Sequence, residues 1–450
     1  MQYHPAAMHP APHTPPRAGR LGQATVHDLT HDGRGVARVE GKVVFIEGAL
    51  PGERVRYERT RRKPDFDEGR VVEVLEPSPE RVEPGCAHFG VCGGCVLQHL
   101  APEAQIRIKE KLLLDNLERI GGVRPQRMLT PLTGPVWGYR GRARLGVKYV
   151  RKKGRVLVGF RERNKRYVAD LERCPVLAPP VDGLLRPLGE LIGTLGLRER
   201  IPQVEVAAGD ERVALVLRVL DPPSDRDRAA MLAFERLHGV DIWLQPKGPE
   251  TAAPLREDVP LPAYQLPAFG LRLEFLPTQF TQINMALNRA MVQQAVELLE
   301  LMGNERVLDL FCGLGNFTLP IATRAAAVVG VEGEAGLVAR AESNARSNAI
   351  GNVRFMVADL GASNGGAAWG EGRFDRVLLD PPRTGAREVL AAVAATGARR
   401  IVYVSCNPAT LARDAGELVH RHGCRLLAAG VLDMFPHTAH VESMAVFERA

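Results

Sequence analysis

The strongest constraint on the fold of this 450-residue chain is a regular alternation of apolar runs and helix-like stretches from about Pro277 to the C-terminus. Each apolar run has the length of one buried strand, and the intervening stretches are long enough for crossover helices. The alternation predicts an α/β domain over residues 276–450, doubly wound and Rossmann-like, with a mostly parallel sheet. The expected strands are 306–311, 327–331, 353–357, 376–379 and 401–404, with a late antiparallel strand at 441–447.

The chain before this domain has three different patterns. Residues 1–18 are rich in proline and histidine and lack acids, which is typical of a disordered tail. Residues 19–77 consist of short alternating runs separated by glycines, which predicts a small β-barrel. Residues 78–275 are mixed and strand-rich, and predict a central α+β domain. It includes a helix over 103–120, whose apolar face is expected to be Ile106, Leu113, Leu117 and Ile120.

Composition excludes several classes of protein. Hydrophobic residues make up 45% of the chain, as in an ordinary globular protein, and no apolar run approaches the roughly 20 residues of a membrane span. No signal peptide is evident. Seven cysteines, an odd number with three crowded together, do not resemble a secreted disulfide framework. We therefore expect a cytoplasmic protein, with a monomer as the default state.

Positive charge is concentrated in one stretch. Residues 140–166 contain twelve lysines and arginines and one acid, Glu162. Aromatic residues that are able to stack on bases lie within or beside the stretch: Tyr139, Tyr149, Phe160 and Tyr167. This lopsided charge favours nucleic acid binding over a solvated face. A second basic run at 54–63, in the predicted barrel, is either a solvated hairpin tip or a grip on phosphates.

A nucleotide-type pocket is predicted where the strand at 306–311 runs into a glycine turn. Gly313 and Gly315 let the backbone approach a ligand closely. Glu332 and Asp359 follow the next two strands, and acids at successive strand ends suit a nucleoside-bearing cofactor without a pyrophosphate. Thr318 occupies the place of the third glycine of an NAD fingerprint. The pattern thus favours S-adenosylmethionine over NAD.

The fourth strand ends in Asp380-Pro381-Pro382-Arg383. A turn of this kind occurs in several classes of methyltransferase. In those that methylate exocyclic amines, an aromatic residue usually follows the prolines and stacks on the target base. Arg383 stands in that position here, which argues against an amine methyltransferase.

Cys406, directly after the fifth strand, is the candidate nucleophile. Asn407 and Pro408 predict a helix start beside it, which is expected to lower the thiol pKa. Cys312 and Cys424 are expected to be small buried residues. A thiolate that adds to carbon 6 of uracil makes carbon 5 nucleophilic, and a base must then remove the carbon 5 proton. Glu442 is the candidate base, unless it is an exposed strand acid; His440 is either the base or a residue that orients the site.

Five blocks of the sequence, at 280–284, 309–316, 380–385, 405–413 and 432–442, together resemble the RNA (uracil-5-)-methyltransferase family, especially its ribosomal RNA members. The resemblance covers nearly the whole chain from residue 19. It implies that 19–77 is a TRAM domain, an OB-like RNA-binding barrel, that Cys406 is the nucleophile and that Glu442 is the base. The S-adenosylmethionine contacts that it implies are Gln282, Phe311, Asn316, Glu332, Asp359 and Asp380.

Four cysteines, Cys86, Cys92, Cys95 and Cys174, form a candidate metal site. Four thiolates suit either zinc or an iron–sulfur cluster, and the spacing does not decide between them. His88 and His99 are alternative ligands. The resemblance implies a structural 4Fe-4S cluster. The spacing differs from that of radical enzymes, which argues against a radical methylthiotransferase, another class that can carry a TRAM domain.

The resemblance also implies a substrate. Members with both the barrel and the cysteine cluster commonly modify large-subunit (23S) ribosomal RNA, so we expect that RNA and neither DNA nor a membrane as the partner. Transfer RNA is the alternative substrate with the same chemistry. A non-catalytic RNA-binding assembly factor on a methyltransferase scaffold is the alternative from another functional class.

Overall fold

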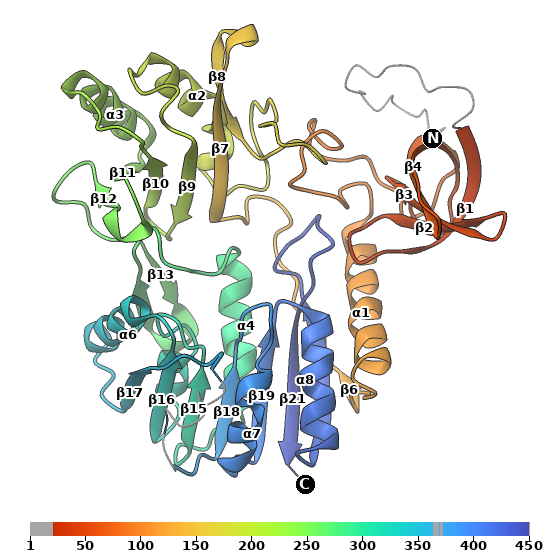
Figure 1. Ribbon diagram of the computed structural model, residues 1–450. Coiled ribbons are helices and arrows are strands. Elements are labelled where there is room, and N and C mark those ends of the chain that lie inside the picture. Colours follow the sequence, from red (N-terminus) through yellow and green to blue (C-terminus); the bar gives the residue numbers. More distant parts are fainter. Residues whose placement is uncertain (1–20, 363–368, 370–371, 450) are drawn as a thin grey trace. The chain divides into compact units, whose positions relative to one another are not determined.

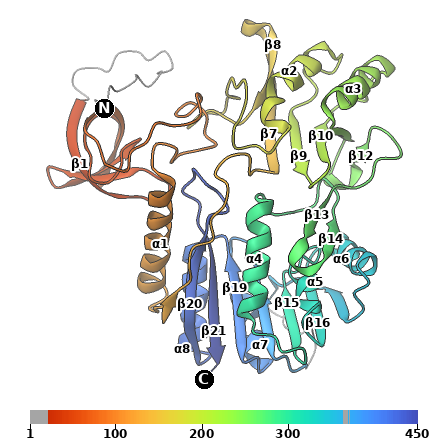
Figure 2. The ribbon, with the colours of Figure 1, turned by 180° about the vertical axis from the view of Figure 1, so that it is seen from behind.

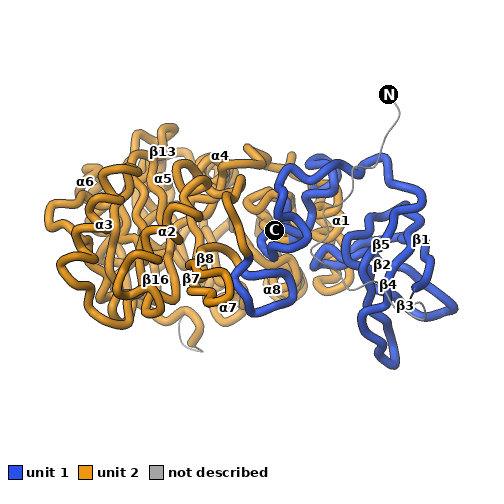
Figure 3. Tube along the Cα trace, turned by 90° about the horizontal axis from the view of Figure 1, so that it is seen from above, with its two compact units in different colours: residues 1–105, 161–169, 437–439 blue, residues 106–160, 170–436, 440–450 orange. Residues whose placement is uncertain are grey.

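The structure, a computed structural model, describes residues 21–362, 369 and 372–449, and the predicted tail over 1–18 lies outside the described residues. Two compact units divide the chain, and they are coloured separately in Figure 3. Unit 1 comprises residues 1–105, 161–169 and 437–439. Unit 2 comprises residues 106–160, 170–436 and 440–450. Each unit therefore contains segments that are distant in the sequence.

A closed five-stranded barrel is the main element of unit 1 (Figure 1). Antiparallel pairing of the first strand with the fourth closes it, in the order β1-β2-β3-β5-β4. Alternate side chains point inward, and Val26, Ile46, Val55 and Tyr57 are fully buried there. The small barrel predicted from the alternating runs is confirmed. Its strands are β1 Leu21–Leu29, β2 Gly35–Val39, β3 Lys42–Glu47, β4 Arg54–Arg62 and β5 Phe66–Glu76.

The helix α1, Pro102–Arg119, corresponds to the helix predicted at 103–120. Leu113 and Leu117 are fully buried, as expected from their spacing. Ile120 was expected on the same face, and this prediction is wrong: its side chain is 53% exposed. The helix ends one residue earlier, and Gly122 has a positive φ of 61°, so the chain turns away from the helical path.

The central part of unit 2 is a six-stranded sheet in the order β12-β11-β10-β9-β7-β8, seen from behind in Figure 2. Its strands are β7 Arg142–Val150, β8 Arg155–Gly159, β9 Gln203–Ala208, β10 Val213–Arg218, β11 Asp241–Gln245 and β12 Ala253–Pro254. This part of the chain also contains two helices, α2, Leu185–Thr194, and α3, Asp225–His238. Ser224 caps α3 through a reciprocal capping box with Asp227.

The C-terminal part is an eight-stranded sheet in the order β17-β16-β15-β18-β19-β21-β20-β6. The first five strands of this order are parallel, and β21 lies antiparallel between β19 and β20. The predicted doubly wound domain is confirmed, including its late antiparallel strand. The strands are β6 Arg127–Met128, β15 Arg306–Leu310, β16 Ala327–Glu332, β17 Val353–Val357, β18 Arg376–Leu379, β19 Arg400–Ser405, β20 Cys424–Leu432 and β21 Glu442–Arg449. The helices are α4 Met285–Leu298, α5 Thr318–Ala322, α6 Ala335–Ser347, α7 Arg387–Ala395 and α8 Pro408–His420.

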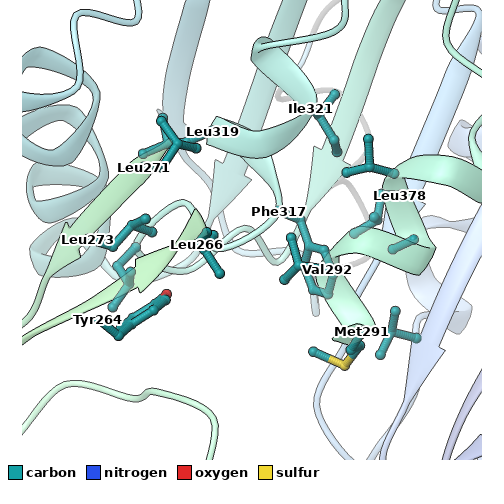
Figure 4. Close-up of a cluster of buried hydrophobic side chains, with 14 of the residues drawn as sticks. Tyr264, Leu266, Leu271, Leu273, Met291, Val292, Phe317, Leu319, Ile321 and Leu378 are labelled. Atoms are coloured by element: carbon teal, nitrogen blue, oxygen red, sulfur yellow. The ribbon is translucent and has the colours of Figure 1, made fainter. Parts of the chain in front are cut away.

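A hydrophobic core fixes the start of this sheet (Figure 4). Leu266 and Leu273 come from a hairpin of β13, Ala263–Leu266, and β14, Leu271–Glu274. They belong to the same cluster as Met291 of α4 and Phe317, the residue before α5. A fully buried side chain of this size contributes roughly 1.5–3 kcal/mol, so the cluster holds the turn after β15 firmly in place.

Among the helices that the structure describes, none is long and apolar enough to cross a membrane.

Candidate active site

The predicted site residues lie at one edge of the eight-stranded sheet. Because β15 to β19 are parallel, their carboxyl ends meet at the same edge, where open α/β sheets bind ligands. Glu332 is the last residue of β16, and Asp359 lies two residues past the end of β17. Asp380 and Cys406 directly follow β18 and β19. These four residues therefore lie at the same edge of the sheet.

The turn after β15 has an unusual backbone. Phe311 has a φ of +64°, a left-handed conformation that costs a residue with a side chain about 1–2 kcal/mol. Gly313 and Gly315, with φ of +57° and +97°, adopt such values without this cost. Strain of this kind is retained where the surroundings fix the backbone, and it is common at ligand sites.

Glu332 holds this turn. One carboxylate oxygen accepts the N–H of Gly313 at 3.1 Å, and the other accepts the N–H of Glu334 at 3.0 Å. A carboxylate has about four lone-pair positions, so it retains acceptor capacity for a ligand hydroxyl. The glycine turn and the acid at the end of β16 therefore form one structure.

Asn316 is clamped by two residues that the sequence prediction missed. Its side-chain oxygen accepts hydrogen bonds from the Tyr264 hydroxyl at 2.8 Å and from the Asn288 amide at 3.0 Å, and its own amide donates to Asn288 Oδ1 at 2.9 Å. Asn288 lies on α4, one turn after Asn284, the residue that caps this helix. The sequence signal that could have identified Asn288 is a second asparagine, four residues after Asn284, on a largely apolar helix.

Burial and neighbouring carboxylates raise the pKa of two acids, Asp309 and Asp380. Burial, with the charge of Glu332 adding to it, raises the pKa of Asp309 to about 7, although a hydrogen bond from Thr318 opposes the shift. Burial, followed by the charges of Glu442 and Asp309, raises the pKa of Asp380 well above its ordinary value. Such a concentration of carboxyl groups fits a positively charged ligand.

The pairing of β19 with β21 brings Cys406 and Glu442 together. Ser405, the last residue of β19, pairs with Ser443 in the antiparallel register, and Cys406 and Glu442 are the residues next to this pair. Directly facing residues of an antiparallel pair have Cβ atoms about 4.5–5.5 Å apart. Glu442 is only 7% exposed, which excludes the alternative of an exposed strand acid. His440 Nε2 lies 3.5 Å from Glu442 Oε1, and its ring contacts Phe435 edge-on.

The expected lowering of the Cys406 pKa is wrong for the free protein. Burial, followed by the charges of Glu442 and Asp380, raises this pKa to about 11, although the charge of Arg383 opposes the shift. The start of α8 was expected to stabilise the thiolate. However, the Asn407 side chain already accepts the N–H of Ala409 there, and burial of the thiol together with two nearby carboxylates outweighs what remains of the helix effect.

The loops that carry Asp380 and Cys406 are fastened to each other. Asn407 Nδ2 and Thr410 Oγ1 donate to the carbonyl of Arg383, at 3.1 and 3.2 Å. Arg413 donates to the Thr384 carbonyl at 2.8 Å. Three side chains of one loop and helix thus fix the backbone of the other, and the two loops behave as one rigid support.

The segment that leads to His440 and Glu442 is anchored by Lys109 of α1. This lysine is 1% exposed, and its Nζ donates to Asp433 Oδ1 at 2.6 Å and to the Phe435 carbonyl at 3.1 Å. The Tyr139 hydroxyl donates to the Pro436 carbonyl at 3.0 Å. A buried charge pair therefore determines the path of the chain just before the candidate base.

Gln282 and Asp359 are two further predicted cofactor contacts. Gln282 is half-buried, two residues before the cap of α4. Asp359 is exposed, and its carboxylate accepts the N–H of Gly361 at 2.9 Å. Their contact with a cofactor stays a prediction.

The candidate metal ligands are divided between the units. Cys86 and Cys92 are partly exposed and Cys95 is buried in unit 1, whereas Cys174 is buried in unit 2. Burial and the charge of Cys86 raise the pKa of Cys92, although the N–H of Gly94 donates to its sulfur at 3.4 Å. In the part of the chain that the structure describes, no three histidine, cysteine or acidic residues are grouped to hold a metal ion. Cys312 and Cys424 are buried, as predicted.

Comparison with known proteins gave clear similarities. The family model described as tRNA (Uracil-5-)-methyltransferase matches residues 269–450, and the TRAM domain model matches residues 19–75. The 23S rRNA (uracil(1939)-C(5))-methyltransferase RlmD of Alkalilimnicola ehrlichii is 56% identical over 428 residues, covering 95% of this chain and 96% of the relative. The protein of the same name from Thiobacillus denitrificans is 54% identical, covering 94% and 98% of the two chains.

One solved structure covers nearly the whole chain. It is the tRNA (uracil-54, C5)-methyltransferase of Pyrococcus abyssi in complex with S-adenosyl-L-homocysteine, with a TM-score of 0.73 and 24% identity. The match covers 95% of this chain and all of that one. At this identity, the likeness establishes the shared fold.

Proposed function

Since the chain belongs to the RNA (uracil-5-)-methyltransferase family, we propose that it methylates carbon 5 of one uridine in 23S ribosomal RNA, the uridine that corresponds to position 1939 in the names of its relatives. S-adenosylmethionine supplies the methyl group on a positively charged sulfur. The high identity to these relatives over almost their full length supports the ribosomal substrate.

The observation that carries the proposed chemistry is that Cys406 and Glu442 adjoin the Ser405–Ser443 pair at the end of β19 and the start of β21, near enough for the charge of Glu442 to act on the thiol. The Cys406 thiolate adds to carbon 6 of the uracil, a carbon–sulfur bond forms, and the ring becomes an enolate whose carbon 5 is nucleophilic. After carbon 5 has taken the methyl group, Glu442 removes its remaining proton. The electron pair of that C–H bond restores the ring double bond, and the thiolate leaves carbon 6.

Formation of the thiolate requires help from the pocket. With a pKa of about 11, Cys406 is almost entirely protonated at neutral pH in the free protein. A positive charge bound at this edge offsets the charges of Asp380 and Glu442, and so lowers the thiol pKa. The same carboxyl groups that suppress the thiolate in the free protein therefore link its formation to cofactor binding.

The residues proposed to hold S-adenosylmethionine have complementary chemistry. Glu332 and Asp359 offer carboxylate oxygens to hydroxyl groups, and Asp380 lies near enough to the thiol for its charge, when ionised, to raise the thiol pKa. Phe311 offers a strained backbone and an aromatic face, and Asn316 is held by its amide partners. Gln282 completes the proposed set from the segment before α4.

We also propose that Cys86, Cys92, Cys95 and Cys174 hold a structural 4Fe-4S cluster. Four thiols fit the ligand chemistry of such a cluster, and the hydrogen bond from Gly94 to Cys92 Sγ is the kind of donor that stabilises a bound thiolate. The cluster would hold together the segments that carry these cysteines and would take no part in methyl transfer. Iron and acid-labile sulfide in anaerobically purified protein, retained in Cys424→Ser and lost in Cys174→Ser, are the expected result; zinc or no metal would contradict it.

The substrate is tested by incubating the protein with methyl-labelled S-adenosylmethionine and unmodified 23S ribosomal RNA or transfer RNA. We expect label in 5-methyluridine from ribosomal RNA, absent with Cys406→Ala. Label only in transfer RNA would favour the second substrate, which the match to the tRNA (Uracil-5-)-methyltransferase model also supports. Absence of 5-methyluridine from both RNAs would contradict the enzyme and leave the assembly-factor alternative.

A further inference from the structure

Residues 161–168 of unit 1 form a small hairpin outside the barrel. Arg161 and Val168 make a β-bridge, and the N–H of Glu162 donates to the Tyr167 carbonyl at 2.8 Å. The N–H of Lys165 donates back to the Glu162 carbonyl at 3.2 Å, and Asn164 has the left-handed φ of 58° that a tight turn requires. The backbone of the hairpin is therefore defined by its own hydrogen bonds.

The hairpin contacts the loop that contains Cys92, and it also contacts the barrel. The N–H of Gly93 donates to the Arg161 carbonyl at 2.9 Å, and the N–H of Arg163 donates to the Val91 carbonyl at 2.8 Å. The Arg163 guanidinium forms an ion pair with Glu47 of β3. These contacts lie within one unit, and they attach the hairpin both to residues 91–93 and to β3.

Of the four aromatic residues in the basic stretch, Tyr167 is the one available for stacking. Tyr139 is buried, and the Tyr149 and Phe160 rings lie beneath the guanidinium groups of Arg198 and Arg140. The Tyr167 side chain, in contrast, is 70% exposed.

Two arginines of the hairpin also differ from the barrel arginines that have acidic partners. Barrel arginines pair with acids across the strands, as in Arg54 with Glu76 and Arg56 with Glu73. The basic run at 54–63 is thus partly neutralised within the protein. In the hairpin, Arg161 and Arg166 are exposed, and no ion pair is recorded for them among the described residues.

We propose that this hairpin binds an unpaired segment of the RNA substrate, with Tyr167 stacked on a base and Arg161 and Arg166 on neighbouring phosphates. An exposed aromatic ring in the same hairpin as two exposed guanidinium groups matches single-stranded RNA, which offers a base face every nucleotide and a negative charge between bases. A paired helix offers phosphates but no open base face. The proposal rests on the proposed function only for the identity of the partner as RNA.

The test compares RNA binding by four full-length variants, using fluorescence anisotropy with an unmodified 23S ribosomal RNA fragment that contains the target uridine. We expect Tyr167→Ala to weaken binding roughly ten-fold, and Tyr167→Phe, which keeps the ring, to bind like the parent. Arg161→Ser/Arg166→Ser should lower the slope of log affinity against log salt by about 0.7 for each lost phosphate contact. The matched control, Arg54→Ser/Arg56→Ser, removes two paired arginines and should change the slope less.

Equal binding by Tyr167→Ala and the parent, or a salt slope that falls equally in both arginine pairs, would overturn the proposal and leave the hairpin as a contact for a protein. Circular dichroism checks that each variant is folded. Because binding is measured without methyl transfer, a parent protein that binds through the hairpin but makes no 5-methyluridine would refute the proposed function and retain this inference. In an active enzyme, Tyr167→Ala should raise KM for RNA and leave kcat unchanged.

Discussion

Replacing Glu442 by glutamine should make Cys406 more acidic in the free protein. The two residues adjoin the Ser405–Ser443 pair at the end of β19 and the start of β21, and residues so placed typically have Cβ atoms about 5 Å apart. At an effective dielectric constant of about 20, a unit charge at that distance changes the interaction energy by about 3.3 kcal/mol, or about 2.4 units of pKa. Because Cys406 is partly exposed, solvent screening reduces this value, and we expect a decrease of at least about one unit.

The decrease can be measured from the pH dependence of alkylation. A pKa of about 11 leaves roughly one thiol in a thousand ionised at pH 8, so the rate constant for iodoacetamide at Cys406 should rise about ten-fold or more in Glu442→Gln. Quantifying the alkylated peptide by mass spectrometry separates Cys406 from the other cysteines. The control is Glu334→Gln, which removes an exposed carboxylate at the start of α6. Equal rates in the parent and Glu442→Gln would refute the reasoning that Glu442 faces the thiol as a charged neighbour.

Four other predictions concern the same sheet edge and its supports. Asp309, with a pKa raised to about 7, is about half protonated at neutral pH. Binding of the cationic cofactor should therefore release up to about half a proton, and the binding affinity should increase as pH rises from 6 to 8. A calorimetric binding enthalpy that does not depend on the buffer would contradict this prediction. Lys109→Met should lower the free energy of unfolding by about 3–5 kcal/mol, because it leaves Asp433 buried and unpaired. The double variant Lys109→Met/Asp433→Leu should regain part of this stability in denaturant titration. A double variant that regains none would contradict the importance of the pair. Phe311→Gly should be more stable than Phe311→Ala by about 1 kcal/mol in the same titration, because glycine adopts the positive φ without strain, and a more stable alanine variant would argue against that backbone. His440→Ala should slow release of the methylated RNA more than formation of the covalent adduct. A denaturant-resistant protein–RNA complex should therefore accumulate. Unchanged accumulation would mean that His440 does not orient Glu442.

The strands of the C-terminal sheet were predictable because each is a short apolar run between turn and helix signals. β20, Cys424–Leu432, was not predicted. Its leucines and alanines favour a helix as much as a strand, and only pairing with β21 and β6 decides between them. Ile120 fits the helical spacing, but the spacing does not reveal that the helix ends one residue before it.

The position of the site was also predictable, because residues that follow parallel strands must meet at one edge. Its electrostatics were not. The pKa of Cys406 depends on which carboxylates face the thiol, and Glu442 approaches from a strand that is distant in the sequence and runs in the opposite direction. The Lys109–Asp433 pair joins residues 324 positions apart, and no local pattern indicates such a contact.

The most direct test of the account is to identify the covalent intermediate. Glu442→Gln should form the bond between Cys406 and carbon 6, accept the methyl group, and fail to remove the carbon 5 proton. Nuclease and protease digestion of the trapped complex, followed by tandem mass spectrometry, should yield the peptide of Cys406 carrying a methylated uridine nucleotide from 23S ribosomal RNA. A nucleotide attached to Cys312 or Cys424, or rapid release of 5-methyluridine without any adduct, would contradict the roles assigned to Cys406 and Glu442.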